Sequence, residues 1–325
     1  MVRGRGLLLV SVVAALLVTV GTTAVLLLVD PKQPKAEAIK TGGLAGGAVV
    51  ALYALWLNDR RRRTEEARHE LESEKVADER FARAVELLGN EADQVRLGAM
   101  HALAGLASAA PRYKQTVLDV LCAYLRRPFH HPAFGKRPED PDRAYSGLSH
   151  EKRLEEVSAE HDLELVVRQT AQRLITDLLP WGDDPDDTPY QVDLTAASLV
   201  YFRLTGRRFG RLIARRAQFY GMTEFREVEL SKPALFSGGA FHGRVDFRHG
   251  RFCGGISFQD VAFARELDVT GAQVATFLHV SPMPPAKVIG SLEALADVTY
   301  RVAPQGWPLT GDGRPAVLPD HVQQD

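Results

Sequence analysis

The chain has little cysteine and few lysines. Cys122 and Cys253 are its only cysteines, and they form no Cys-x-x-Cys pair. They therefore predict neither a disulfide framework nor a zinc site. Nine of the 40 basic residues are lysines, and the net charge is −1. A charge so close to zero gives the whole chain no general attraction to nucleic acid.

The sequence also lacks the short motifs of common enzyme classes. It has no Gly-rich dinucleotide or phosphate loop after a strand, no G-x-S-x-G and no H-E-x-x-H. His130 and His131 have no third ligand at a metal-site spacing, so they are interpreted as packing or solvent-facing residues. The acidic run at 183–187 lacks the glycine and terminal glutamate of a calcium loop. We therefore expect no enzyme activity, no cofactor and no metal.

Two uncharged apolar runs stand near the N-terminus, at residues 7–29 and 41–57. As helices they would be about 35 and 26 Å long, close to the roughly 30 Å hydrocarbon core of a bilayer. Residues 1–58 are therefore predicted to form a hairpin of two transmembrane helices. A cleaved signal peptide is the alternative, since Arg3 and Arg5 precede the first run, but that run exceeds the usual length of about 7 to 15 residues.

The basic residues near these runs predict the orientation of the hairpin. Arg60, Arg61, Arg62 and Arg63 directly follow the second run, which places both chain termini in the cytoplasm. Three lysines in the connecting segment oppose this orientation, but the arginine block is the stronger signal. The expected location is the inner (plasma) membrane of a bacterium, as a multi-pass protein.

Small residues recur on the second run, as Gly42, Gly43, Gly46 and Gly47. Such small-xxx-small pairs let another helix approach closely. The first span is the expected partner because it is already tethered, and a helix of another protein is the alternative.

Residues 59–80 are almost wholly charged or small and predict an exposed juxtamembrane helix, with Arg61–Glu65 and Arg62–Glu66 at the i,i+4 spacing. Residues 81–189 then show four amphipathic helical faces, interrupted by a Pro-rich loop at 128–150. We expect a small helical region of two helical hairpins.

One of these faces carries a recognisable pattern. The residues that form it are Asp93, Val95, Arg96, Ala99, Ala102 and Leu103. This resembles the D-x-V-R-x-x-A-x-x-A-L signature of HEAT-like repeats, which implies a short helical stack. We expect the stack to cover the N-terminal end of the following domain, because a bare end would leave strand edges exposed.

Residues 190–279 are repetitive. From residue 225 onward, apolar residues recur every eleven positions in three columns, and before that they recur every five. A short fixed period with obligatory apolar columns is typical of a solenoid. The predicted interior residues are Leu194, Leu199, Leu204, Phe209, Phe219, Phe225, Leu230, Phe236, Phe241, Phe247, Phe252, Phe258 and Phe263. Residues between the columns, such as Arg248, are expected to point outward.

This pattern resembles the pentapeptide-repeat family, whose units place Leu or Phe at the centre and a small residue two positions earlier. The resemblance implies a right-handed quadrilateral β-helix, here of about four coils. The fold class is therefore α+β and multidomain, with two transmembrane helices, a HEAT-like helical region and this β-helix.

Five arginines crowd the first half of the repeats, where the pattern is weakest. They are Arg207, Arg208, Arg211, Arg215 and Arg216. A solvated outer face is the plainer interpretation, and a partner-binding patch is the alternative. At the weak centre Ala214, Leu212 or Ile213 is expected to turn inward instead.

The segment 280–325 stops repeating and is rich in proline. Val298, Tyr300 and Val302 alternate with polar residues in strand fashion. We expect residues 292–310 to fold back as a C-terminal cap, with everything beyond about 314 loosely held.

These features favour a non-enzymatic, membrane-tethered module that presents its β-helix to an unidentified cytoplasmic protein. One alternative is a regulator of gyrase that imitates DNA, which the family resemblance suggests. Residues 190–279, however, hold eight acidic and twelve basic residues, a balance of +4 and the wrong sign for that role. Nucleic acid is not an expected partner. The other alternative is an accessory or sensor subunit of a membrane system.

Overall fold

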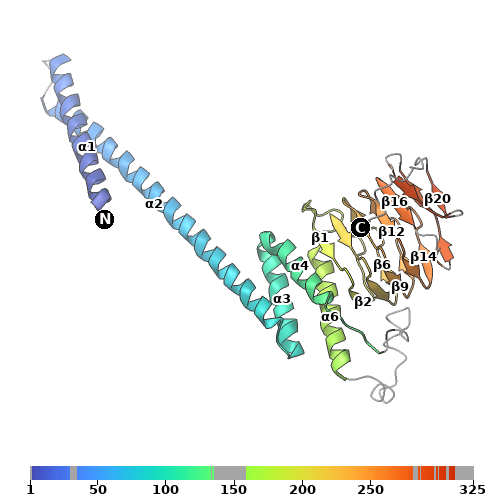
Figure 1. Ribbon diagram of the computed structural model, residues 1–325. Coiled ribbons are helices and arrows are strands. Elements are labelled where there is room, and N and C mark those ends of the chain that lie inside the picture. The colour runs from blue at the N-terminus through green and yellow to red at the C-terminus, as the bar shows by residue number, and fades with distance from the viewer. Residues whose placement is uncertain are drawn as a thin grey trace. The chain divides into compact units, whose positions relative to one another are not determined.

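The computed structural model describes residues 2–29, 35–132, 134, 159–280, 285, 287–295, 298, 300–304 and 307–311. The chain divides into two compact units, Met1–Glu79 and Arg80–Asp325, which we describe separately (Figure 1). Most of the Pro-rich loop and the far C-terminal tail lie outside the described residues, as does the expectation of a loosely held end beyond 314.

The first unit contains helix α1 (Val2–Val29) and most of helix α2 (Lys35–Leu87). The two helices meet at Gly46, where an added Cβ would collide with the hydroxyl of Thr19 and come close to the carbonyl oxygen of Ala15. Gly43 and Gly47 meet nothing within 4 Å. The expected packing on the first helix therefore occurs at Gly46, whereas Gly43 and Gly47 lie on an open face of α2.

One stretch of α2, Ile39–Leu87, is long and apolar enough to cross a membrane by length and composition. Only 7% of its most apolar 18-residue segment is buried. In α1 the corresponding apolar segment is shorter and comprises Val13–Val25. Among the described residues there is thus one candidate span, where the sequence predicted two. Leu17, Leu28, Leu44 and Leu52 are among the exposed apolar side chains of these helices.

The charged segment after residue 58 is helical, as expected, and forms part of α2. Arg61 pairs with Glu65 at 3.0 Å and Arg62 with Glu66 at 2.9 Å. Arg63 pairs backward with Asp59 at 2.9 Å, and the guanidinium of Arg60 lies 5.4 Å from the ring centre of Trp56. All four arginines are exposed.

The second unit begins with a helical layer made of the end of α2, α3 (Asp93–Ala109), the short 3-10 helix η1 (Pro111–Tyr113), α4 (Lys114–Leu125) and α6 (Ala159–Leu178). The four predicted amphipathic faces are present. Helices α3 and α4 both pack on α6. Met100, Leu121 and Ile175 are fully buried between them, and Phe81 stacks on Tyr113 with ring centres 5.9 Å apart.

A largely buried polar cluster ties the three helices together. Arg96, from the sequence motif, contacts Asp93 one turn earlier and reaches Glu164 of α6 at 2.8 Å. Glu164 also accepts the hydroxyl of Tyr124, at 3.0 Å. Arg168 is buried beside it and donates to a backbone carbonyl of α4. Burial lowers the pKa of Arg168, although the charge of Glu164 opposes that shift.

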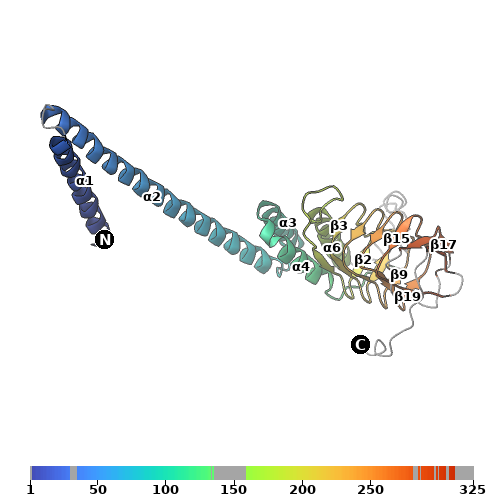
Figure 2. The same cartoon turned by 90° about the horizontal axis from the view of Figure 1, so that it is seen from above.

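The rest of the unit is a parallel β-solenoid of about five turns, consistent with the predicted β-helix. All pairings between its described strands are parallel. The strands form four sheets, and Figure 2 shows successive turns following one another away from α6.

Two sheets have six strands each, named here by their first strand. The β1 sheet contains, in spatial order, β1 (Gln191–Asp193), β4 (Arg211–Ile213), β8 (Ala234–Leu235), β12 (Ile256–Phe258), β16 (Phe277–Val280) and β19 (Tyr300–Val302). The β3 sheet contains β3 (Arg208–Phe209), β7 (Glu229–Leu230), β11 (Arg251–Phe252), β15 (Ala272–Val274), β18 (Leu292–Ala294) and β20 (Leu309–Thr310).

The other two sheets have four strands each. The β2 sheet contains β2 (Ser198–Val200), β5 (Gln218–Tyr220), β9 (Ala240–Phe241) and β13 (Ala262–Phe263). The β6 sheet contains β6 (Thr223–Glu224), β10 (Val245–Asp246), β14 (Glu266–Asp268) and β17 (Lys287–Ile289).

The interior of the solenoid is a column of apolar side chains in register. Phe219 stacks on Phe241 and Phe225 on Phe247, with ring centres 4.4 and 4.8 Å apart. Twelve of the thirteen predicted interior residues are at most 2% exposed, and Phe263 is half-buried. At the weak centre, Ala214 and Leu212 both point inward.

The corners of the turns repeat as well as the interior. Arg216, Gly238 and Asp260 occupy equivalent corners of successive coils, all with φ between 52° and 67°. This left-handed conformation costs a residue with a side chain roughly 1 kcal/mol or more, and glycine almost nothing. The corner is therefore imposed by the stacked turns, because two of the three residues are not glycine.

The C-terminal segment continues the solenoid and does not fold back. Strands β17, β18 and β19 pair in parallel with β14, β15 and β16, and β20 pairs with β18. Val298 and Trp307 are buried against the last turns. The expected fold-back cap at 292–310 is thus corrected: these residues cover the last repeat-bearing turn by adding to the same ladder.

Candidate functional site

The first turn of the solenoid presents four strand edges on the side of the helical layer, and these edges are covered to different extents. On β1, the side-chain amide of Gln115 in α4 donates to the Gln191 carbonyl at 2.9 Å and accepts the Gln191 N–H at 2.8 Å. The amide thus replaces the hydrogen bonds of a missing neighbouring strand.

Gln172 of α6 does the same for β2. Its amide donates to the Val200 carbonyl at 3.4 Å and accepts the Val200 N–H at 3.1 Å, in a buried position. The β3 edge is covered by backbone, because Arg208 N–H donates to the Pro180 carbonyl at 2.8 Å and Trp181 forms an antiparallel bridge with Arg207. Helix placement over the first turn was predicted, but these partners were not.

The fourth edge lies at Arg203, which bridges to Glu224 at the start of the β6 sheet. Its carbonyl accepts the Thr176 hydroxyl at 2.7 Å. Within the described part of the chain, the Arg203 N–H donates no hydrogen bond. This edge is therefore the least covered of the four.

A groove of about 610 Å³ lies over this edge. We call it the α6 groove; its lining residues are Gln169, Gln172, Arg173, Thr176 and Asp177 of α6, Trp181, and Val200, Tyr201, Arg203, Thr205, Arg207, Glu224 and Arg226 of the solenoid. Its volume is in the range of ligand pockets, roughly 300 to 1,000 Å³.

The lining carries four arginines against two carboxylates, an excess of two positive charges. Arg207 is buried, its guanidinium lies 3.9 Å from the ring centre of Trp181, and it donates to the Leu179 carbonyl at 2.9 Å. Burial lowers the pKa of Arg207, an effect that the charge of Asp177 opposes. The indole of Trp181 remains half exposed at the groove.

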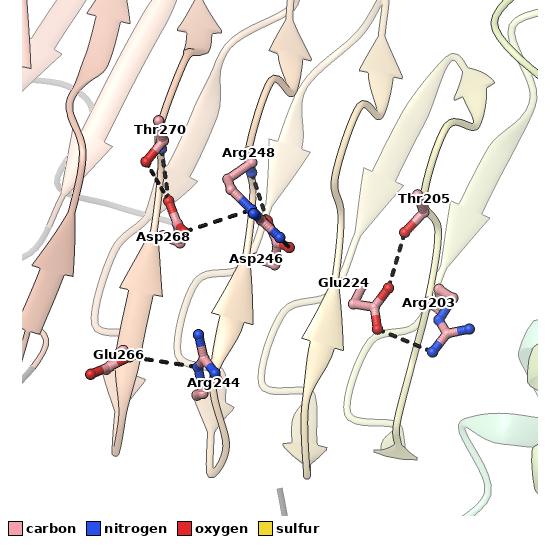
Figure 3. Close-up of polar contacts among 9 residues, drawn as sticks. All are labelled: Arg203, Thr205, Glu224, Arg244, Asp246, Arg248, Glu266, Asp268 and Thr270. Carbon is pink, nitrogen blue, oxygen red and sulfur yellow. Dashed lines mark hydrogen bonds and ion pairs between the residues drawn. The ribbon is translucent and has the colours of Figure 1, made fainter. Parts of the chain in front are cut away.

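Of the two carboxylates, Glu224 is already engaged by its neighbours. Arg203 reaches it at 3.1 Å and the Thr205 hydroxyl donates to it at 3.3 Å (Figure 3). Asp177, the other carboxylate, lies 3.9 Å from the guanidinium of Arg207. The excess positive charge of the groove therefore rests on Arg173 and Arg226.

The outer face of the β6 sheet continues this pattern of paired charges along the solenoid (Figure 3). Arg248 binds Asp246 at 2.7 Å and approaches Asp268 at 3.7 Å. Glu266 pairs with Lys287 at 2.7 Å. Asp246 is buried, which would raise its pKa, but hydrogen bonds from Arg248 lower it overall. Arg248 points outward as expected, and its guanidinium forms ion pairs with Asp246 and Asp268.

The predicted arginine patch is divided by the structure. Arg207 and Arg208 are tied to the segment after α6, with Arg208 reaching Asp187 at 2.6 Å. Arg211 is half-buried, and only Arg215 and Arg216 are exposed. The groove instead recruits Arg173, Arg203 and Arg226, which are too distant in sequence to be grouped without the fold.

The acidic run predicted not to bind calcium is part of the junction. Asp186 accepts Lys114 Nζ at 2.7 Å and the Tyr190 hydroxyl at 2.8 Å. Partial burial would raise the pKa of Asp186, but these hydrogen bonds and those from Thr188 lower it well below the usual carboxyl range. Among the described residues, no group of three or more His, Cys, Asp or Glu is suited to hold a metal ion.

The histidines and cysteines of the sequence analysis lie apart from the groove lining. His131 is buried and contacts Asp162 at 3.2 Å, which fits the packing role, and His130 is exposed. Cys122 is buried and Cys253 exposed, and both thiols are free. Burial raises the pKa of the Cys122 thiol to about 12, so it is not a thiolate at neutral pH.

Comparisons of the chain with protein-family models, with curated proteins and with solved structures find no match. The class of protein therefore rests on the architecture itself: a helix-capped parallel β-solenoid in one unit and an exposed apolar helical segment in the other.

Proposed function

We propose that the chain is a non-enzymatic, membrane-tethered interaction protein that presents its solenoid and helical cap to a cytoplasmic protein partner. Within this proposal the solenoid is of the pentapeptide-repeat type and the helical layer is HEAT-like. A coil of 22 residues over four faces supports the first assignment, because Phe219 faces Phe241 and Phe225 faces Phe247. The ion pair of Asp93 with Arg96 is consistent with the second.

The observation that carries the proposal is the exposed apolar surface of α1 and α2, bounded by a block of arginines. A large apolar surface in water is unfavourable by about 25 cal/mol per Å², and it typically marks membrane or protein contact. The side chains of Leu16, Leu17, Leu44, Leu52 and Leu55 are all more than half exposed. Burying them in a bilayer as two spans, with Arg60 and its three neighbours on the cytoplasmic side, satisfies both features.

Membrane extraction and a topology reporter test the proposal. The full-length protein should remain in the membrane fraction after alkaline carbonate and be released only by detergent. A reporter fused after Asp325 should be active only when it works in the cytoplasm. Release by carbonate would contradict the tether, and activity of a periplasmic reporter at that position would contradict the two-span orientation.

The gyrase-regulator alternative is less well supported, because imitation of duplex DNA requires a continuous negative surface. The carboxylates of the β6 sheet are paired with arginines and a lysine, as at Asp246 and Glu266. An accessory or sensor role in a membrane system would use the same tether, and the identity of the partner distinguishes it.

A further inference from the structure

We propose that the α6 groove binds an extended acidic peptide segment of the partner protein. The inference rests on the proposed function, since it assigns a place and a chemistry to the partner's contact. The groove joins three properties that such a peptide requires: positive charge, an exposed aromatic surface and a strand edge with an open N–H group.

The charge comes from arginines that the fold does not neutralise. Arg173 is exposed on α6, and Arg226 is half-buried on the solenoid wall. Arg207, by contrast, is engaged by Asp177 and by the Leu179 carbonyl. A carboxylate in the groove would be attracted to the charges of Arg173 and Arg226, and would be favoured over a neutral ligand.

The shape favours an extended chain. Arg203 lines the groove, and its backbone N–H donates no hydrogen bond among the described residues. Extended peptides add to such strand edges through their backbone carbonyls. Trp181 contributes the exposed part of its indole to the lining, with Arg207 stacked against the ring. An apolar or aromatic side chain of the peptide would pack there.

The test is fluorescence anisotropy with the purified full-length protein in nonionic detergent at low salt. The probe is a fluorescein-labelled peptide of seven glutamates with one central phenylalanine, and the comparison peptide replaces the glutamates by lysines. We expect the acidic peptide to bind, the basic peptide not to bind, and added salt to weaken binding.

Arg173→Glu should weaken binding about fivefold, because reversing one exposed charge removes an attraction and adds a repulsion. Arg215→Glu is the matched control: it makes the same change in net charge on an exposed residue outside the groove. It should change binding less than about twofold. Thermal unfolding of both variants checks that the fold is intact.

Equal weakening by both variants would show attraction to net charge alone and would overturn the proposal, as would absence of peptide binding. If phosphatidylglycerol vesicles distinguish wild type from Arg173→Glu while the peptide does not, the groove recognises lipid headgroups and the proposal is wrong. Neither outcome affects carbonate resistance, so failure of this inference is distinguishable from failure of the membrane tether.

Discussion

The middle turns of the solenoid and its first turn hold the same fold by different means. In the middle, phenylalanines of successive coils repeat and their rings stack, as Phe236 does on Phe258 at 5.5 Å. In the first turn the centres are Leu194, Leu199, Leu204 and Phe209. Its outer edges are covered in part by side chains of the helical layer such as Gln115 and Gln172.

The difference follows from position in the ladder. A middle strand has a neighbour on both sides, so an apolar column and backbone hydrogen bonds are sufficient. A terminal strand has one neighbour, and its other backbone groups need partners from elsewhere. In the first turn, therefore, polar side chains stabilise the fold by binding the strand edges. The same turn has an open N–H group at Arg203 and the positive charge of the α6 groove, which are available for binding.

The largest expected effect comes from the middle column. Phe236→Ala should lower the free energy of unfolding by about 4 kcal/mol, since it leaves a cavity among five surrounding rings. Urea unfolding of the full-length protein in detergent, followed by circular dichroism, measures this. Phe263→Ala, at a half-buried position of the same solenoid interior, should cost clearly less. Equal losses would mean that burial does not determine the contribution of a ring.

The next effect tests the polar cluster of the helical layer. Arg168→Ala should cost about 3 kcal/mol, because it removes one partner from a buried charged network that contains Glu164. Arg173→Ala lies on the same helix but is exposed, and should change stability by less than about 0.5 kcal/mol. Similar melting temperatures for the two variants would show that the cluster does not stabilise the cap.

Gln172 and Gln115 each make two hydrogen bonds to the backbone of a strand edge, Gln172 in a buried position and Gln115 in an exposed one. Gln172→Ala should cost about 2 kcal/mol, because the N–H and carbonyl of Val200 are buried and lose both partners. Gln115→Ala should cost less than about 1 kcal/mol, because water can reach the Gln191 backbone. Amide hydrogen exchange at Val200 and Gln191 measures each edge directly. Faster exchange at Gln191 alone would contradict this ordering.

The smallest effect is a pH dependence at the junction. The pKa of Asp186 is lowered in the folded protein, so its contribution is present above the ordinary carboxyl range and is lost as the pH falls through and below that range. Asp186→Asn should therefore destabilise by about 1 kcal/mol at pH 7, and the difference from wild type should shrink below about pH 4. Thermal unfolding across this range checks it. A constant difference would exclude the charge of Asp186 as the cause, and Asp183→Asn, an exposed neighbour, is the control.

The sequence predicted the repeating parts of the molecule well. Columns such as Phe225, Phe236 and Phe247 identify the interior because each coil must place an apolar residue at the same height, and this constraint is local and periodic. The amphipathic helices followed from the same kind of spacing. For the segment after residue 280 the sequence predicts a cap that folds back, because the repeat is no longer recognisable there. In the structure its backbone continues the parallel ladder.

The sequence by itself determined the solenoid interior, the helical layer and the apolar character of the N-terminal segment, because each depends on spacing between near neighbours in the chain. Only the tertiary structure decided which polar residues matter. It divided the arginine patch and gathered Arg173, Arg203 and Arg226 around one groove. Those arrangements depend on contacts between α6 and the first two coils, and no local pattern records which outward-facing residues such packing will bring together.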